Sequence, residues 1–145
     1  MRDHLSQARE NRAGLREAIG NVERALAAPA GNRYEPWGKE LAHELDELGE
    51  ALERHIAATE APGGLLDDIV HEEPRLAHKA WLVREDHGAL RHRLDEARAA
   101  LPLGEDDVGL ARDRVVELLE AIVRHRHMGS DLVYEAFNVD MEAGD

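Results

Sequence analysis

Three histidines lie where their side chains could form one binding site. The chain has nine histidines, and His55, His87 and His125 each fall on the apolar stripe of a different predicted helix. Imidazole is a good ligand for iron, zinc, copper and nickel, and the cores of helical bundles are a common place for such sites. A single core-facing histidine is more often a hydrogen-bonded packing residue. Three of them on three helices favour a metal site.

The relative heights of these residues along the bundle are compatible with one shared site but do not require it. If the third and fourth helices turn back near Leu103, His125 lies level with Leu82. It is then about one helical turn, or ~7 Å, from His87. Glu60 is the nearest carboxylate, five residues after His55. That spacing turns it about 140° away from His55 around the helix, although the helix end at position 62 could relax this angle.

The other histidines lie off the apolar stripes or near helix ends, so we expect them to be exposed. They are His4, His43, His71, His78, His92 and His127.

The apolar residues recur at steps of three and four, which predicts long amphipathic helices. We expect four of them, over 3–28, 37–60, 74–100 and 107–138, with a short helical turn over 65–71 and Asp106 as the N-cap of the last. Proline and glycine interrupt the pattern between them. Short connections between long helices predict an all-α, antiparallel up-down four-helix bundle. The length of 145 residues fits a single domain over 1–145.

Composition excludes several classes of function. The formal net charge is −13, and an acidic surface disfavours binding to nucleic acid. The chain has no cysteine, which removes disulfides, thiolate metal sites and cysteine nucleophiles. No apolar run approaches the ~18 residues that would cross a membrane. The N-terminus is polar from the start, so we expect a cytoplasmic protein without a signal peptide.

Short motifs in the same helices resemble the hemerythrin-like family of HHE cation-binding proteins, in its bacterial branch. They are the segment 55–60 (HIAATE), the segment 85–87 (EDH), His125, and the C-terminal segment 131–140 (DLVYEAFNVD). The resemblance covers nearly the whole chain. It implies a four-helix bundle with a non-haem iron site, often di-iron, that handles or senses oxygen, nitric oxide or peroxide. By position, His55, Glu60, His87 and His125 match metal ligands of the family.

Several positions depart from the family's pattern. Asn11 and Arg12 stand at the height of the first-helix histidine, Arg91 stands four residues after His87, and Gly129 and Ser130 stand where an acidic ligand is usual. Since two metals need roughly a double ligand set, we expect one iron ion or none, not a di-iron pair.

Two of these departures have alternative interpretations. Arg12 could point inward and pair with Glu60, or it could extend to the surface, which is the interpretation we favour. Gly129 could mark a small cavity beside His125 or a close approach of two helices. Close packing is the simpler account.

Three functions remain open from the sequence. The first is a hemerythrin-like metalloprotein with a small diatomic or peroxide ligand. The second is a degenerate bundle without metal that acts as an interaction or scaffold module. The third is a redox enzyme, for example one that decomposes peroxide. The sequence contains no phosphate-binding glycine loop, nucleophile motif or zinc-protease motif. It does not identify the protein partner.

Overall fold

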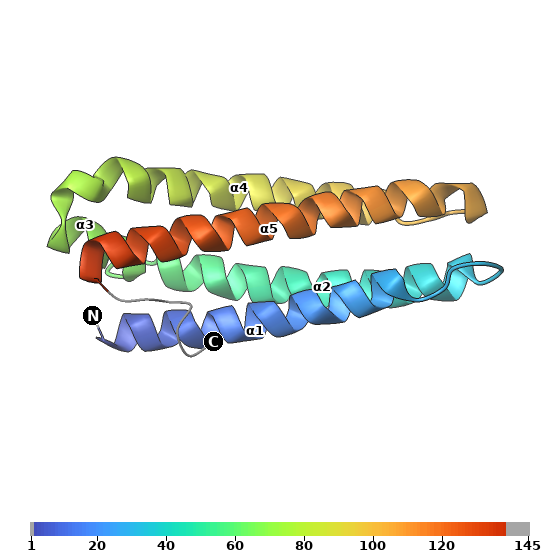
Figure 1. Ribbon diagram of the computed structural model, residues 1–145, viewed down its shortest axis with the longest axis horizontal. Helices are drawn as coiled ribbons and strands as arrows, with labels where there is room; N and C mark the ends of the chain where they lie inside the picture. Colours follow the sequence, from blue (N-terminus) through green and yellow to red (C-terminus); the bar gives the residue numbers. More distant parts are fainter. Residues whose placement is uncertain (1, 139–145) are drawn as a thin grey trace.

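The computed structural model describes residues 2–138, and in this range it is helical without strands (Figure 1). The helices are α1 (Arg2–Ala27), α2 (Tyr34–Glu60), α3 (Leu65–Glu72), α4 (Ala77–Ala99) and α5 (Val108–Phe137), with single 3-10 turns at Pro74–Leu76 and Glu105–Asp107. The predicted all-α class is confirmed. The four long helices lie side by side along the length of the molecule, while the short α3 lies at one end of it (Figure 1).

The ends of the helices differ from the predicted ones in small ways. The third long helix begins with a 3-10 turn at Pro74 before α4 starts at Ala77. The expected N-cap role of Asp106 is wrong, because Asp107 takes the N-cap position of α5. Its carboxylate does not cap the helix but accepts a hydrogen bond from the main-chain nitrogen of Leu103, 3.3 Å away. The side chain of Asp107 is therefore bonded to the preceding loop and does not cap the first turn of α5.

Two apolar clusters form the core. The larger one, which we call the main cluster, is centred on fully buried leucines such as Leu45 and Leu118 and draws on all four long helices. The smaller one, which we call the α3 cluster, joins α3 to one end of the bundle through residues such as Leu66 and Ile69. The apolar stripes of the sequence supply both clusters.

A layer of polar side chains separates the two clusters. The helices α1, α4 and α5 supply residues to both clusters, and Arg12, His87 and His125 lie between those residues. Together with His55 of α2, they form what we call the polar layer. In α4, for example, Val83 belongs to the α3 cluster and Leu90 to the main cluster, with His87 between them. The three histidines of this layer lie close together, with ring centroids 4.8–5.4 Å apart.

Within residues 2–138, no helix has an apolar stretch long enough to cross a membrane.

The main cluster should dominate stability. We expect Leu118→Ala to lower the free energy of unfolding by about 2–5 kcal/mol, because the side chain is fully buried and its removal leaves a cavity. Leu103→Ala should change it by less than about 0.5 kcal/mol, since Leu103 is 94% exposed. Urea unfolding followed by far-UV circular dichroism measures both. Equal effects of the two substitutions would contradict this account of the core.

Candidate metal centre

The three core histidines converge on one point. One ring nitrogen from each of His55, His87 and His125 lies within 4.8 Å of the other two. The Nε2 atoms of His55 and His125 are 3.2 Å apart, and the ring centroids of His87 and His125 are separated by 4.8 Å. The side chains thus span the offset of one turn that the sequence predicted. This group of three could hold a metal ion.

The exposure of the histidines follows the predicted stripes with two exceptions. His87 and His125 are each 1% exposed. His55 is only partly buried, although we expected it to be largely buried. His4, expected at the surface, is also partly buried and contacts the carboxylate of Asp68. The remaining five are exposed as predicted: His43, His71, His78, His92 and His127.

Two carboxylates fix the orientation of two rings. Nδ1 of His87 donates a hydrogen bond to Oε2 of Glu60 at 2.8 Å, and Nδ1 of His125 donates one to Oδ2 of Asp86 at 2.7 Å. These bonds engage Nδ1 and leave Nε2 as the nitrogen available to a ligand. The Nε2 atom of His87 is buried, and within residues 2–138 it has no hydrogen-bond partner.

Of the four expected ligands, the three histidines converge on one point, whereas Glu60 contacts His87. Glu60 lies outside the group of converging nitrogens, because the turn of the helix directs its carboxylate to His87 Nδ1. Asp86 was not among the residues that the sequence predicted for the site. Its partner is His125, which lies 39 residues away on α5. An acidic residue beside a core histidine was the available signal, but pairing across helices depends on the packing.

Burial keeps all three imidazoles neutral at neutral pH. Together with smaller effects of the neighbouring His125, His87 and Arg12, it lowers the pKa of His55 to about 3. It also lowers the pKa of His87 to about 3, with a smaller contribution from His125. The pKa of His125 is lowered too, mainly by burial, although its hydrogen bond to Asp86 opposes the shift. Neutral rings keep the nitrogen lone pairs that a metal needs.

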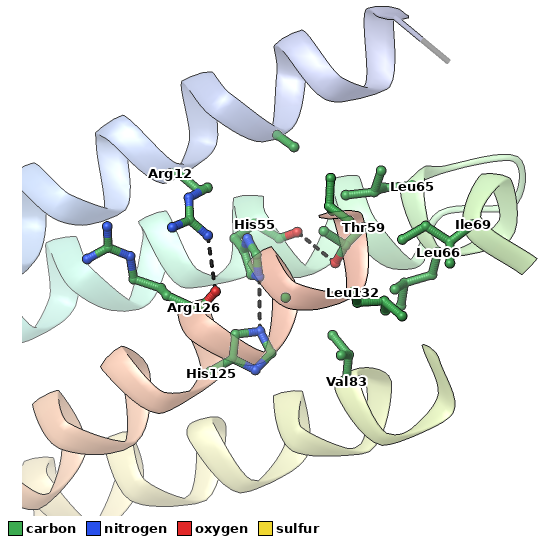
Figure 2. Close-up of a pocket in the computed structure, with 13 residues that line it drawn as sticks. Arg12, His55, Thr59, Leu65, Leu66, Ile69, Val83, His125, Arg126 and Leu132 are labelled. Carbon is green, nitrogen blue, oxygen red and sulfur yellow. Dashed lines mark hydrogen bonds between the residues drawn. The ribbon is translucent and has the colours of Figure 1, made fainter. Parts of the chain in front are cut away.

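Arg12 occupies the α1 position of the polar layer. The expectation that it extends to the surface is wrong, since the residue is only 5% exposed. Nη1 of Arg12 donates a hydrogen bond to the main-chain oxygen of Arg126 at 3.3 Å (Figure 2). Its inward direction places a permanent cation beside the histidines, as its effect on the pKa of His55 and His125 shows.

A small cavity of about 40 Å³ borders the histidines. Figure 2 shows Arg12, His55 and His125 on one side of it, and the apolar side chains of α3, including Leu66 and Ile69, on the other. Apolar side chains and Gly129 make up most of the remaining lining, and His87 is not part of it.

Gly129 does not mark a close approach of two helices. A Cβ atom added there would meet no neighbour within 4 Å, so the expected packing role is wrong. The residue lines the cavity instead, which is the alternative that the sequence left open.

No protein-family model, curated protein or solved structure gives a significant match to the chain.

The lowered pKa values predict how the stability of metal-free protein depends on pH. Unfolded histidine binds a proton below its ordinary pKa of about 6.5, while His55 and His87 resist protonation down to about 3 in the folded state. Stability should therefore be full above pH ~6.5 and fall as the pH drops from there towards ~3, by up to about 1.4 kcal/mol per pH unit for each group.

Urea unfolding of chelator-treated protein at pH 7 and at pH 5 measures this loss. Glutamine at position 87 removes one titrating group, so His87→Gln should lose less stability between the two pH values than the unmodified chain. His78→Gln, a change at an exposed histidine, should lose as much as the unmodified chain. The same pH dependence in all three proteins would contradict the assigned neutral state of His87.

Proposed function

We propose that the chain is a hemerythrin-like, antiparallel up-down four-helix bundle that binds a single metal ion through His55, His87 and His125. Iron is the metal that the family resemblance implies, and oxygen, nitric oxide or peroxide is the ligand class. The observation that carries the proposal is the convergence of three neutral imidazoles in the polar layer.

The donor set fits a metal ion. Three neutral nitrogens suit iron, zinc, copper or nickel and leave further coordination positions open. Histidines that bind metals almost always donate their second ring N–H to a carboxylate or carbonyl group, and His87 and His125 both do so. A metal would also give the buried Nε2 of His87 a partner, and a buried polar atom without one costs about 1–3 kcal/mol.

A second ion lacks ligands in the described part of the chain. Arg12 brings a cation to the α1 position of the layer. The guanidinium of Arg91 is bound at the surface by both carboxylate oxygens of Glu53, at 2.8 and 2.9 Å. Gly129 has no side chain to offer. These three features support a mononuclear site.

The residues around the ion would each have a separate task. Glu60 and Asp86 hold the rings of His87 and His125 with Nε2 directed inward. The main cluster and the α3 cluster exclude water from the two sides of the layer. When bound, iron would supply a Lewis-acidic, redox-active centre for the small ligand. Decomposition of peroxide is an activity that this arrangement would allow, and turnover of peroxide would distinguish it from reversible binding.

One observation favours the alternative of a metal-free bundle that acts as an interaction module. The 3.2 Å contact between Nε2 of His55 and Nε2 of His125 is a hydrogen bond that needs no metal. It gives the Nε2 atoms of His55 and His125 a hydrogen-bond partner but leaves Nε2 of His87 buried without one among the described residues. Since the metal site satisfies all three rings, we prefer it.

Metal content tests the proposal. Protein purified without an affinity tag and reconstituted with iron(II) under anaerobic conditions should hold no more than one tightly bound ion per chain, measured by elemental analysis after desalting. His87→Ala should abolish retention, because it removes a buried ligand. His78→Ala should leave retention unchanged, because that residue is exposed. Two ions per chain, or full retention in His87→Ala, would show that the ligands are wrongly assigned. No retained metal would favour the interaction module.

The supporting role of the two carboxylates makes a separate prediction. Asp86→Asn and Glu60→Gln should each weaken metal affinity about 10- to 100-fold without changing the number of ions bound, because they alter ring orientation and basicity rather than the ligand set. The exposed neighbour Glu85 provides the matched control, and Glu85→Gln should bind metal normally. Competition with a chromogenic chelator gives the affinities. Complete loss of binding in Glu60→Gln would mean that Glu60 is itself a ligand.

A further inference from the structure

We propose that the exposed side of α4 is a self-association surface, through which two copies of this chain form a weak antiparallel dimer. The surface, which we call the outer face of α4, includes the 3-10 turn before the helix. Its residues are all exposed and recur at steps of three and four: Pro74, His78, Trp81, Leu82, Glu85 and Ala89. His87 and the polar layer lie on the buried side of the same helix. A dimer of this kind therefore needs no metal.

The centre of the outer face is apolar. Trp81 is 52% exposed and Leu82 is 41% exposed, whereas Trp37, the other tryptophan of the chain, is fully buried. The indole of Trp81 stacks on the ring of His78, with centroids 5.9 Å apart and an interplanar angle of 17°. Figure 1 shows α4 along one edge of the bundle. Tryptophan is enriched at the centres of protein interfaces, so a half-exposed indole beside an exposed leucine marks a contact surface.

The charge of this region allows two copies to approach each other. The chain has 31 acids against 18 Lys and Arg, and like net charge keeps such proteins apart. The segment 74–92, in contrast, contains four Lys and Arg residues and two acids. One of these acids, Asp86, is bound to His125 in the polar layer, so Glu85 is the acid that the outer face presents.

The cations beside the outer face are paired within the chain. Nζ of Lys79 donates to both carboxylate oxygens of Glu135, at 2.8 and 2.9 Å, and Arg91 binds Glu53 in the same two-fold manner. The outer face is therefore close to neutral, with an apolar centre. Such a face fits a second copy of the chain better than it fits a strongly acidic partner.

The order of residues along the outer face is self-complementary. In an antiparallel helix pair with a twofold axis between positions 81 and 82, residues equally far from that axis face each other. Trp81 and Leu82 then each meet their own counterpart beside the axis. Glu85 lies opposite His78 of the second copy, and neutral histidine can donate a hydrogen bond to its carboxylate. The small Ala89 lies opposite Pro74 of the second copy, which permits close approach.

A groove beside Leu82 adds apolar surface to the contact. It has a volume of about 280 Å³ and lies between α4 and α5, where Leu82, Met128 and Leu132 line it. Met128 is 38% exposed there. Leu82 of the second copy would cover this groove, because both copies of that residue lie on the same flank of the helix pair. One helix face is small for a protein interface, so the dimer should be weak and should depend on concentration.

Sedimentation velocity of the full chain, from micromolar to near-millimolar concentration, tests the dimer. The mass should rise from one chain to two. Trp81→Glu should weaken association about 100-fold or more, since a twofold interface loses the indole twice and gains two carboxylates at its axis. Leu110→Glu is the matched control: Leu110 is 49% exposed on α5, the added charge is the same, and association should not change. Far-UV circular dichroism verifies that both variants are folded.

Disulfide formation tests the register, because the chain has no cysteine of its own. Positions seven apart on one helix are separated by about 10 Å, which is too far for a disulfide within one chain. With glutathione disulfide as the oxidant, the double variant His78→Cys/Glu85→Cys should form a covalent dimer with two disulfides. The matched control, His43→Cys/Glu50→Cys, replaces an exposed histidine and glutamate at the same spacing on α2 and should remain largely monomeric.

Three results would overturn the proposed dimer. They are a single-chain mass of the unmodified protein at every concentration, association of Trp81→Glu equal to that of the unmodified chain, and equal cross-linking of the two cysteine pairs. None of these results bears on the metal site, whose test is the metal content of the chain.

Discussion

The hydrogen bonds from His87 to Glu60 and from His125 to Asp86 are the interactions on which the rest of the site depends. A histidine ring in an apolar core can turn either nitrogen towards a neighbour. With Nδ1 committed to a carboxylate, each ring directs Nε2 into the bundle. Both carboxylates are partly exposed, so water can help to solvate their charge, while the rings they hold are almost completely buried. Two carboxylates at the surface thus set the orientation of the buried rings.

The same bonds constrain the helices. Glu60 is on α2 and binds a ring on α4, whereas Asp86 is on α4 and binds a ring on α5. Each bond therefore fixes the height of one helix against another, within a layer that has apolar clusters on both sides. Sliding one helix by a turn would leave a buried imidazole without its carboxylate and would break the match of the clusters. Arg12 completes the layer from α1 by binding the main chain of α5.

The sequence predicted the elements well because they depend on local pattern. Apolar spacing of three and four residues identified the long helices and placed His87 and His125 in the core, where they are found. The pattern could not predict side-chain partners across helices. The family resemblance implied Glu60 as a ligand, but it could not predict the contact of this carboxylate with a ring on another helix. Arg12 was expected at the surface because burying a cation is costly, and only the packed layer reveals its contact with the main-chain oxygen of Arg126.

The most direct test of the account is to locate the metal. Crystals of the metal-loaded chain, measured at the absorption edge of the ion, should give one anomalous peak per chain in contact with Nε2 of His55, His87 and His125, with Glu60 and Asp86 still bound to the Nδ1 atoms. Two peaks in the polar layer, a peak coordinated by Glu60, or a peak only at surface histidines would contradict it.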